Sequence, residues 1–541
     1  MIQTQVLVVG AGPVGLTLAL DLAQRGVRVL LVEKNAAPLH LPKMERSNPR
    51  TMEIFRRLGV VDRVRAAGLP ADMPMDVLIV HSLAEPPLVR QEYPSVAETR
   101  RRIAACGDGR LPREPYQLIS QYTLEPILLE AARHTPGLTV RQSTEFISLQ
   151  QDEHGVTAEI CSDEGSVQAV RASYVVGCDG GGSAVRKQLG VQLQGRAQIG
   201  SITNIFFRCD DFLAKSRVGF ARHYCIARAS AGGGAAGVIV VQDDMKHLAL
   251  HMLGPPGFDP VTLLRDVTQL DIHPQILHAA PWTQHLVVAE RHAVGRVFLA
   301  GDANHLYIPA GGLGMNTGIV DAINLSWKLA GTLQGWGGPD LLASYETERA
   351  AVAHRNCDAA AWAIEGVLAW RGAFTPLVLE DSAAGRAARA DFVRRAEPMN
   401  RRVYEMHGAD LGYRYDSAVI MSEEGPAPPS PITAFEPTTW PGAHLPHVWL
   451  QPELALYDRL RTNAYTLLHL NGSRQGISTF GDAMRARGAP LDVLSLSDPR
   501  IRSVFERDYL LVRPDFHVAW RGNRLPDAKR LAAVVTGYSS P

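Results

Sequence analysis

The chain has no excess of charge of either sign, no long apolar run and no paired cysteines. Lys+Arg and Asp+Glu both number 55 in 541 residues, which excludes the basic surface of a dedicated nucleic-acid-binding protein. Charged residues interrupt every apolar run well short of the ~20 residues of a membrane span, so no membrane partner is expected. The six cysteines form no CxxC pair, which argues against a disulfide framework and against a zinc or other metal site.

The remaining composition is that of a large folded protein. Hydrophobic residues make up 46% of the chain and charged residues 20%, which excludes an intrinsically disordered protein. At roughly 150 residues per domain, the length predicts two to four domains. The first residues lack the basic segment of a secretory signal, so we expect an enzyme of the reducing cytoplasm. The oligomeric state stays open between a single chain and a homo-oligomer.

The first motif lies at the start of the chain. An apolar strand is expected at 6–9, followed by the glycine turn GAGPVG at 10–15 and a helix over 16–24. A second apolar strand at 29–32 ends at Glu33. This order of strand, glycine turn, helix, strand and acid is typical of dinucleotide binding.

Each position in this motif has a chemical reason. Gly10 permits the tight turn, Gly12 lets the backbone approach a pyrophosphate, and Gly15 allows close packing of helix on strand. The free N–H groups of the helix N-terminus attract the phosphates. Glu33 is placed to accept hydrogen bonds from a ribose diol.

Two further strands end in motifs of the same kind. The stretch 172–190 contains Asp179-Gly180 after an apolar strand, and 295–331 contains Gly301-Asp302 after another. A glycine-rich loop follows at 311–316, and the spacing predicts a helix from near Asn316 with one buried face. On that helix we expect Asp321 on the surface, not in catalysis.

These motifs resemble the FAD-dependent aromatic hydroxylases, single-component flavoprotein monooxygenases related to para-hydroxybenzoate hydroxylase and phenol hydroxylase. The similarity rests on GAGPVGL at 10–16, VGCDGGGSAVR at 176–186 and AGDANHLYIPAGGLGMNTGIVDAINLSWKLAG at 300–331. Weaker matches extend it over residues 1–410 and, more faintly, 440–541. The resemblance implies an FAD site formed by Gly10, Gly12, Pro13, Val14, Gly15, Glu33, Lys34, Arg46, Gln121, Asp179, Gly180, Gly301, Asp302, Pro309, Gly312, Leu313, Gly314, Met315 and Asn316.

The resemblance also implies a reaction. NAD(P)H would reduce FAD, and O2 would form a flavin hydroperoxide that hydroxylates a phenol: a substituted phenol, a chlorophenol or nitrophenol, a nitrocatechol, or a polyketide phenol. There is no second GxGxxG with its own strand–helix unit, so the nicotinamide is expected to visit without a dedicated domain. Alternatives are Baeyer–Villiger or another flavin oxidation of a polyketide, and a non-catalytic FAD-fold regulator. The intact GGLGMN loop at 311–316 argues against the regulator.

Candidates for orienting or deprotonating the phenol are His305, Tyr307, His223, Tyr224 and, more weakly, Tyr116. His305 and Tyr307 directly follow the Gly-Asp motif; the alternative is that His305 only packs behind the cofactor. His223 and Tyr224 alternate across an expected strand, so at most one of them should face a pocket.

The expected fold class is α/β, with a doubly wound, Rossmann-like FAD domain, a β-sheet substrate domain and a C-terminal domain. The FAD domain is expected to be discontinuous, and the resemblance implies that the C-terminal domain is thioredoxin-like; having no cysteine, it has no dithiol chemistry. The expected segments are 1–80, 115–195 and 290–360 for FAD, 80–115 and 196–290 for substrate, 360–425 as a helical segment, 425–446 as a proline-rich linker, and 447–541 as the C-terminal domain. A glycine-rich loop at 229–237 is expected to help a pocket close.

Overall fold

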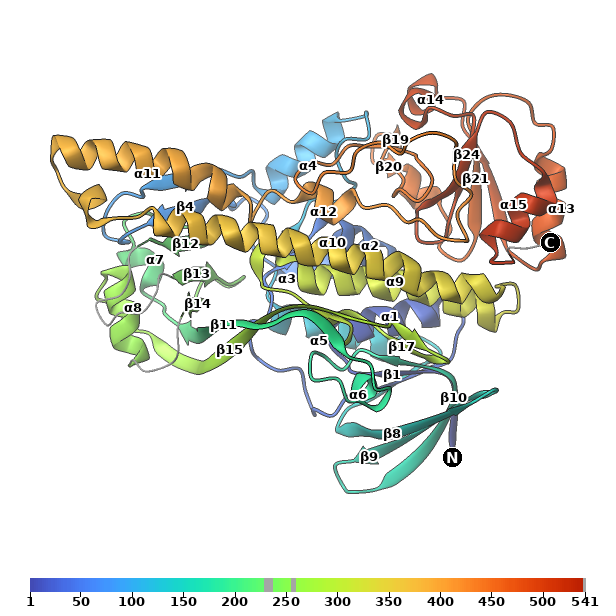
Figure 1. Cartoon of the computed structure of the whole chain (residues 1–541), viewed down its shortest axis with the longest axis horizontal. Helices are drawn as coiled ribbons and strands as arrows, with labels where there is room; N and C mark the ends of the chain where they lie inside the picture. Colours follow the sequence, from blue (N-terminus) through green and yellow to red (C-terminus); the bar gives the residue numbers. More distant parts are fainter. Residues whose placement is uncertain (228–236, 254–258, 539–541) are drawn as a thin grey trace.

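The computed structural model describes residues 1–227, 237–253 and 259–538. The expected glycine-rich loop at 229–237 therefore lies outside the described residues, apart from its last position. Of the five sheets among these residues, the three largest organise the fold, and one long helix joins them (Figure 1).

The first sheet contains the strand at the start of the chain. Its parallel core has the order β17-β10-β1-β2-β7. Apolar stretches of β1, β2, β10 and β17 are buried on both faces, as expected of a parallel sheet covered on two sides, whereas the edge strand β7 is only partly buried. Their bounds are Ile2–Val9 (β1), Val29–Val32 (β2), Leu138–Arg141 (β7), Val167–Gly177 (β10) and Val297–Leu299 (β17).

Helices cover one face of this sheet and an antiparallel ribbon covers the other. The helical face carries α1 (Pro13–Gln24), α5 (Gln121–Arg133) and α9 (Leu313–Leu333), with α2 (Pro49–Arg57) and α3 (Val61–Ala67) beyond them. The opposite face packs against β8 (Thr144–Asp152), β9 (Gly155–Ser162) and α6 (Ala184–Gln188). The expected α/β class, with a layered parallel sheet at its centre, is confirmed.

The second sheet has the order β18-β15-β11-β14-β13-β12-β4-β5. Two long strands, β11 (Leu193–Arg208) and β15 (Gln275–Ala289), connect it to the first sheet. The remaining bounds are Val77–Val80 (β4), Val89–Gln91 (β5), His223–Ile226 (β12), Gly237–Val241 (β13), His247–Leu253 (β14) and His305–Leu306 (β18). Apolar side chains on one face pack against α7 (Phe212–Lys215) and α8 (Pro260–Thr268).

A single helix of 34 residues, α10 (Pro339–Gly372), runs past all three sheets (Figure 1). The expected boundary at residue 360 falls inside this helix, where buried alanines continue on both sides of that position. The helix α11 (Ala383–Arg401) then returns over the second sheet, and the short α12 (His407–Leu411) follows.

The third sheet forms the C-terminal domain, with the order β22-β21-β23-β24. The first pair is parallel and the other two are antiparallel. Its elements are β21 (Tyr465–His469), α13 (Ile477–Ala486), β22 (Leu491–Ser495), α14 (Pro499–Phe505), β23 (Tyr509–Val512), β24 (Val518–Gly522) and α15 (Ala528–Val535). The sequence pattern predicts strands at 465–470, 491–496, 509–513 and 516–520 and helices at 479–487 and 525–535, and it misses α14.

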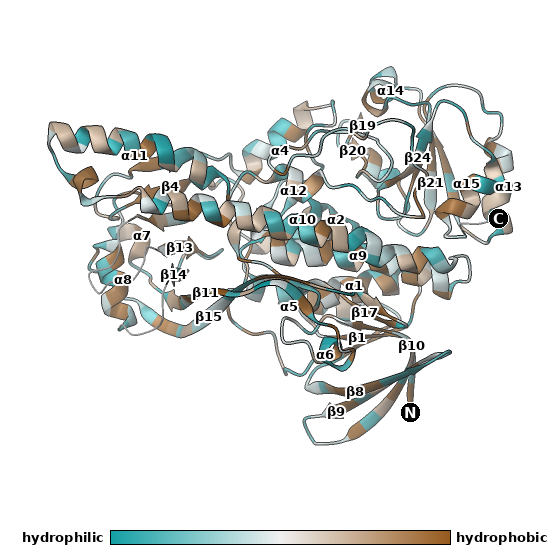
Figure 2. Cartoon of the chain, viewed as in Figure 1, coloured by the Kyte–Doolittle hydropathy of each residue, from teal (hydrophilic) through white to brown (hydrophobic). Residues whose placement is uncertain are grey.

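The proline-rich segment 425–446 contains no helix or strand, but it is more than a spacer. Its last part is buried, with Thr439, Ala443 and Leu445 almost inaccessible to solvent. No helix in the described chain is long and apolar enough to cross a membrane. The longest helix, α10, changes repeatedly between polar and apolar residues along its length (Figure 2).

Candidate functional site

The glycine turn between β1 and α1 has the geometry that the motif predicts. Gly10 has a φ of +105°, which favours glycine. A Cβ on Gly15 would lie 2.0 Å from the carbonyl oxygen of Gly10, so helix and strand pack without room for a side chain. A Cβ on Gly12 would meet none of the described atoms within 4 Å. The turn is therefore rigid at Gly10 and Gly15 and open at Gly12, where a phosphate would approach.

Glu33 follows β2 directly, and its carboxylate closes the same turn. It accepts hydrogen bonds from the backbone N–H of Ala11 at 2.9 Å and from both the backbone and the side chain of Asn35. These contacts hold the carboxylate at the end of the strand, beside the turn. Lys34, next in the chain, is exposed.

Asp302 lies at the end of the neighbouring strand β17, in the 3-10 turn Gly301–Ala303. Its side chain is accessible to solvent and has no hydrogen-bond partner among the described residues. Desolvation by the surrounding protein nevertheless raises the pKa of this carboxyl group. An accessible, unpartnered carboxylate set deep among protein atoms fits the acceptor that sugar-alcohol hydroxyls need.

The glycine-rich loop leads into α9, which begins at Leu313 and not near Asn316 as expected. Two consecutive glycines with positive φ, Gly311 and Gly312, make the turn, and none of the described side chains caps the helix. The N–H groups of its first turn, which includes Gly314, are left to an external acceptor. Pro309, at the start of the loop, is exposed.

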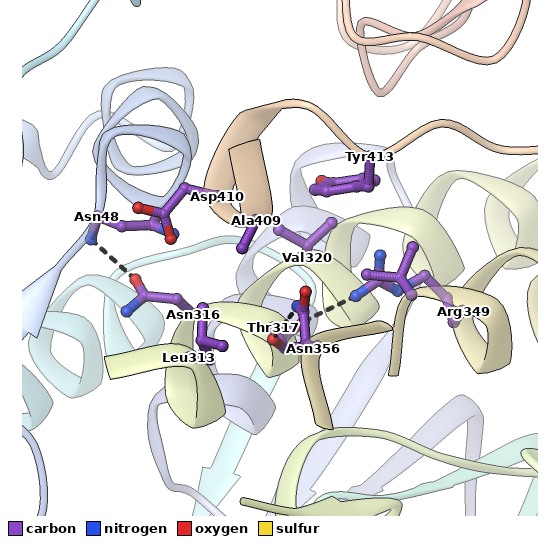
Figure 3. A pocket seen from close by; sticks show the side chains of 11 residues that line it. Asn48, Leu313, Asn316, Thr317, Val320, Arg349, Asn356, Ala409, Asp410 and Tyr413 are labelled. Carbon is purple, nitrogen blue, oxygen red and sulfur yellow. Dashed lines mark hydrogen bonds between the residues drawn. The ribbon is translucent and has the colours of Figure 1, made fainter. Parts of the chain in front are cut away.

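The side chain of Asn316 is used internally. Its Oδ1 accepts a hydrogen bond from Asn48 N–H (Figure 3) and another from the Thr51 hydroxyl. Its Nδ2 donates to the carbonyls of Arg46 and Gly312. It therefore ties the loop to the segment before α2. The Arg46 guanidinium pairs with Asp410 at 3.0 Å, and its Nε has no described partner.

Other predicted cofactor residues have mainly structural contacts. Asp179 caps α6 by accepting from the Ser183 hydroxyl and from the backbone N–H of Ala184 and Val185. Gly180 has a φ of +81°, with nothing described within 4 Å of an added Cβ. Gln121 begins α5 and donates to Glu125.

Asp321 corrects the expectation of a surface residue. It is completely buried in α9, where it accepts from Gly301 N–H, His305 Nε2 and Arg349 Nε. The expectation failed because the pattern assumed one buried face, whereas α9 is buried on all sides from Asn316 to Gly331. Polar residues on its far face pair with charges from α10.

His305 and Tyr307 lie together behind the Asp302 turn. Their rings stack with centroids 4.8 Å apart, and both side chains are buried. The Tyr307 hydroxyl donates to the carbonyl of Ala353. His305 is hydrogen-bonded to Asp321 and Tyr307 to α10. These contacts match the alternative in which His305 packs behind the cofactor.

His223 and Tyr224 face opposite sides of β12, as expected. Tyr224 lies in the apolar core of the second sheet; its hydroxyl donates to Gly219 and accepts from Ala221 N–H. A role for Tyr224 with substrate is therefore corrected, because local backbone groups already satisfy its hydroxyl. His223 faces the other way, with Nδ1 2.8 Å from the Tyr404 hydroxyl.

Sequence reasoning missed the strongest polar cluster near His223. Arg222 Nη2 lies 2.5 Å from Glu45 Oε1, and His223 Nε2 lies 3.5 Å from the same oxygen. Glu45 Oε2, Arg222 Nε and His223 Nε2 are all buried without a hydrogen-bond partner in the described structure. Tyr116, the weakest sequence candidate, lies beside this cluster, its ring 5.9 Å from the Arg222 guanidinium. The available signal is the position of Glu45 directly before Arg46, which the resemblance places in the FAD site.

The same sheet face carries two more unpartnered polar atoms. The pairing register puts Cys225, Val238, His251 and Asn204 in one row across β12, β13, β14 and β11. His251 Nδ1 and Asn204 Oδ1 are buried without a partner among the described residues. Desolvation lowers the pKa of His251 to about 4, so its ring is neutral near pH 7.

A separate small hollow with a cavity volume of about 10 Å³ lies between α9, α10 and α12 (Figure 3). Asn316, Thr317, Arg349, Asn356 and Tyr413 are among its lining residues. Its volume is below that of usual small-molecule pockets, roughly 300–1,000 Å³. It borders the cofactor loop from behind and is a poor fit for an aromatic substrate.

Together, the parallel sheet, the glycine turn with Glu33, the Asp302 turn and the uncapped start of α9 define a flavoprotein that binds FAD. Comparison with known proteins gives the family. A model described as an FAD binding domain matches residues 3–255 and 260–360, and one described as the C-terminal domain of aromatic-ring hydroxylases matches 438–539. The chain belongs to the FAD-dependent aromatic-ring hydroxylases and is an FAD-dependent aromatic monooxygenase.

Individual relatives match over nearly the whole chain. The FAD-dependent monooxygenase apdD of Emericella nidulans is 32% identical, with 99% of this chain and 90% of that protein covered. The 2,4-dichlorophenol 6-monooxygenase of Delftia acidovorans is 32% identical, covering 97% and 96%. The structure of chromopyrrolic acid-soaked RebC with bound 7-carboxy-K252c has a TM-score of 0.90 at 32% identity, covering 99% of this chain and 100% of that one.

Proposed function

We propose that this protein uses NAD(P)H and O2 to hydroxylate a phenolic aromatic ring, and that Glu45, Arg222 and His223 hold the phenol. Bound FAD would supply the reduction and oxygen-transfer chemistry. The observation that carries the proposal is a set of three side chains that each keep a buried hydrogen-bonding atom without a partner among the described residues. Buried polar atoms in folded proteins almost always have partners, so a bound ligand is the natural partner here.

The charges suit an acceptor for a phenol hydroxyl. Burial alone would raise the pKa of Glu45, but Arg222 and His223 outweigh it and hold the pKa below its usual range. Glu45 is therefore an anion that can accept the phenol proton in a hydrogen bond. Arg222 beside it would stabilise a developing phenolate, and a phenolate ring is the better nucleophile towards oxygen transfer.

His223 would orient rather than protonate. Desolvation lowers its pKa, and the Tyr404 hydroxyl engages its Nδ1, so the neutral ring keeps Nε2 for a hydrogen bond. Its burial also helps to exclude water from the reacting ring. Sequence reasoning gave His305 and Tyr307 the same role; their contacts to Asp321 and α10 favour His223.

The spread of polar atoms favours a substrate with more than one oxygen. His251 lies two strands from His223, which is roughly 10 Å across a sheet, and Asn204 lies one strand further. A single small ring held at Glu45 would leave His251 and Asn204 unpartnered. Within the phenol class, we therefore favour an extended phenol with a second polar group, such as a polyketide phenol, over a chlorophenol.

For the C-terminal domain we propose a thioredoxin-like fold with a structural role. The support is its order, strand–helix–strand followed by helix, two antiparallel strands and a helix, with the first strand pair parallel. All six cysteines precede residue 358, so the domain holds no thiol.

A panel of phenols tests the function. NAD(P)H oxidation should be slow alone and at least tenfold faster with a substrate phenol, about 1.4 kcal/mol of barrier, with hydroxylated product identified by mass. The panel should include 2,4-dichlorophenol, 1-hydroxyanthraquinone and 1,8-dihydroxyanthraquinone. Labelled O2 separates ring hydroxylation from ester formation by Baeyer–Villiger insertion. Equal rates with and without every phenol would contradict the proposal.

A pair of variants tests the site. Glu45→Gln keeps the shape but removes the anion, and we expect at least a tenfold loss of kcat/KM with unchanged FAD retention. Tyr224→Phe, on the opposite face of the sheet, is the control and should keep wild-type kcat/KM. Full activity of Glu45→Gln would remove Glu45 from the proposed role.

A further inference from the structure

A continuous buried polar chain connects the Asp302 turn to the C-terminal domain. At one end, Asp321 takes hydrogen bonds from three separate elements: Gly301 N–H at 3.1 Å, His305 Nε2 at 2.9 Å and Arg349 Nε at 2.6 Å. The side chains of Asp321, His305 and Arg349 are completely inaccessible to solvent. Asp321 therefore holds the turn, the following strand and α10 at one point.

The hydrogen bond from Gly301 fixes the backbone next to Asp302. Gly301 has a φ of +63°, and a Cβ there would lie 2.9 Å from the Val14 side chain at the start of α1. The turn is thus wedged between the glycine-rich start of α1 and the Asp321 carboxylate. A shift of Asp321 would move the backbone that carries Asp302.

The other end of the polar chain begins at Glu348, which directly precedes Arg349 in α10. The Glu348 carboxylate accepts hydrogen bonds from both Nη atoms of Arg513 in the C-terminal domain, at 2.6 and 2.9 Å. It accepts another from Lys328 Nζ of α9 at 2.8 Å. Arg513 also makes a bidentate pair with Asp515. All four side chains are buried.

Tyr415 links the two halves directly. Its hydroxyl accepts a hydrogen bond from Arg349 Nη1 at 3.1 Å, and the Arg513 guanidinium lies 5.2 Å from its ring centroid. Two consecutive residues of α10 thus connect to opposite ends of the polar chain. Glu348 binds Arg513, and Arg349 binds Asp321.

Stability alone is a weak reason for such a network. Burying several charges costs desolvation energy that their attraction often only balances, and apolar replacements of similar shape are frequently as stable. A network of this kind instead fixes one relative placement of the groups that it joins, because each charge must meet its partner.

We propose that Asp321 is a positioning residue for the FAD site and that Arg513 of the C-terminal domain sets its placement through Glu348, Arg349 and Tyr415. The C-terminal domain then has a defined task in a protein where it supplies no redox group: it orients the turn that presents Asp302. The inference concerns cofactor binding and does not depend on which substrate is hydroxylated.

The test uses the full chain and measures FAD binding directly. Arg513→Gln removes the charge that meets Glu348, and Arg500→Gln, on an exposed arginine of the same domain that pairs with Asp498, is the matched control. Apoprotein is titrated with FAD at a temperature where circular dichroism is unchanged, and the absorption spectrum of the bound flavin is recorded. We expect Arg513→Gln to weaken FAD binding at least tenfold and to shift the flavin spectrum, with Arg500→Gln like the wild type.

Asp321→Asn should reproduce the effect, because the amide loses charge but keeps an oxygen for Gly301. Arg513→Lys keeps the charge at Glu348 and should restore much of the affinity, and this variant carries the test if the others do not fold. The inference is overturned if Arg513→Gln, or Asp321→Asn, lowers only the melting temperature and leaves FAD affinity and spectrum as in the wild type. It is also overturned if Arg513→Lys binds FAD as poorly as a folded Arg513→Gln.

Discussion

Glu45 and Arg222, which are 177 residues apart in the sequence, form a partly buried ion pair with 2.5 Å between Oε1 and Nη2. The pair joins the segment before α2 to the strand β12, and so joins the FAD domain to the second sheet. Each partner keeps one buried polar atom free, Oε2 and Nε respectively. A ligand that enters between the two sheets would meet a carboxylate and a guanidinium already held in place, so little ordering of these side chains remains to be done on binding.

Replacing a glycine of the turn by alanine should have different effects at Gly15 and at Gly12. In Gly15→Ala, the new Cβ would lie 2.0 Å from the Gly10 carbonyl oxygen, which is backbone and moves only at a cost. We expect a loss of about 1–3 kcal/mol of stability, despite the higher helix propensity of alanine. In Gly12→Ala the Cβ enters open space, so the apoprotein should melt as the wild type while FAD binds at least tenfold more weakly. Thermal melting and FAD titration of both variants test this; the reverse pattern would contradict it.

Asp302→Ala should release FAD. The variant loses an acceptor for charge-assisted hydrogen bonds worth about 1.5–3 kcal/mol, which is roughly 10- to 150-fold in Kd. FAD retention after dilution, followed by the recovery of flavin fluorescence, measures this. Asp163→Ala, at an exposed aspartate of the same domain, is the control. Full retention in Asp302→Ala would show that Asp302 does not bind the sugar-alcohol hydroxyls of FAD.

Glu53 should make stability depend on pH. Burial raises its pKa to about 7, because desolvation outweighs the attraction of Arg50. The folded chain therefore holds this proton where the unfolded chain, with a pKa near 4.5, has lost it. The contribution of Glu53 to stability is complete below pH 4.5 and is lost as the pH rises towards 7.

Glu53→Gln removes that dependence. We expect it to match the wild type near pH 4.5 and to be more stable above pH 7, by up to about 3 kcal/mol. Denaturant unfolding of both proteins at pH 5 and pH 8 provides the measurement, with the exposed Glu164→Gln as control. A difference of equal size at both pH values would mean that the proton on Glu53 is not responsible.

The neighbours His223 and Tyr224 should separate function from stability. His223→Phe keeps an aromatic ring on the face that carries Glu45, and we expect at least a tenfold rise in KM for the best phenol. Tyr224→Phe removes a hydroxyl bonded to Gly219 and Ala221 in the opposite core, and should cost about 1 kcal/mol of stability with KM unchanged. Steady-state kinetics and thermal melting of the two variants show which face of β12 contacts the substrate.

The parts of the fold that the sequence predicts well depend on local patterns. The turn at Gly10–Gly15 and the strands β21 and β23 are marked by apolar runs and turn residues next to each other in the chain. Arg513 and Glu348 carry no such mark, because their partnership spans 165 residues and depends on how α10 meets the C-terminal sheet. Asp321 was misplaced for the same reason: helical periodicity describes one buried face, and only the packing of α10 shows that a second face is buried.

The two-residue strand β18, His305–Leu306, is the edge strand of the second sheet, pairing with β15, and it begins three residues after Asp302. A ligand that shifts the second sheet would therefore also shift the turn that carries Asp302. A ligand that fixes this turn would in the same way fix the edge of the sheet. Thermodynamic linkage makes such an effect mutual: if a phenol raises the affinity for FAD by some factor, FAD raises the affinity for that phenol by the same factor. The ratio of the phenol affinities of holoprotein and apoprotein would then give the coupling free energy between the two sites that this short strand joins.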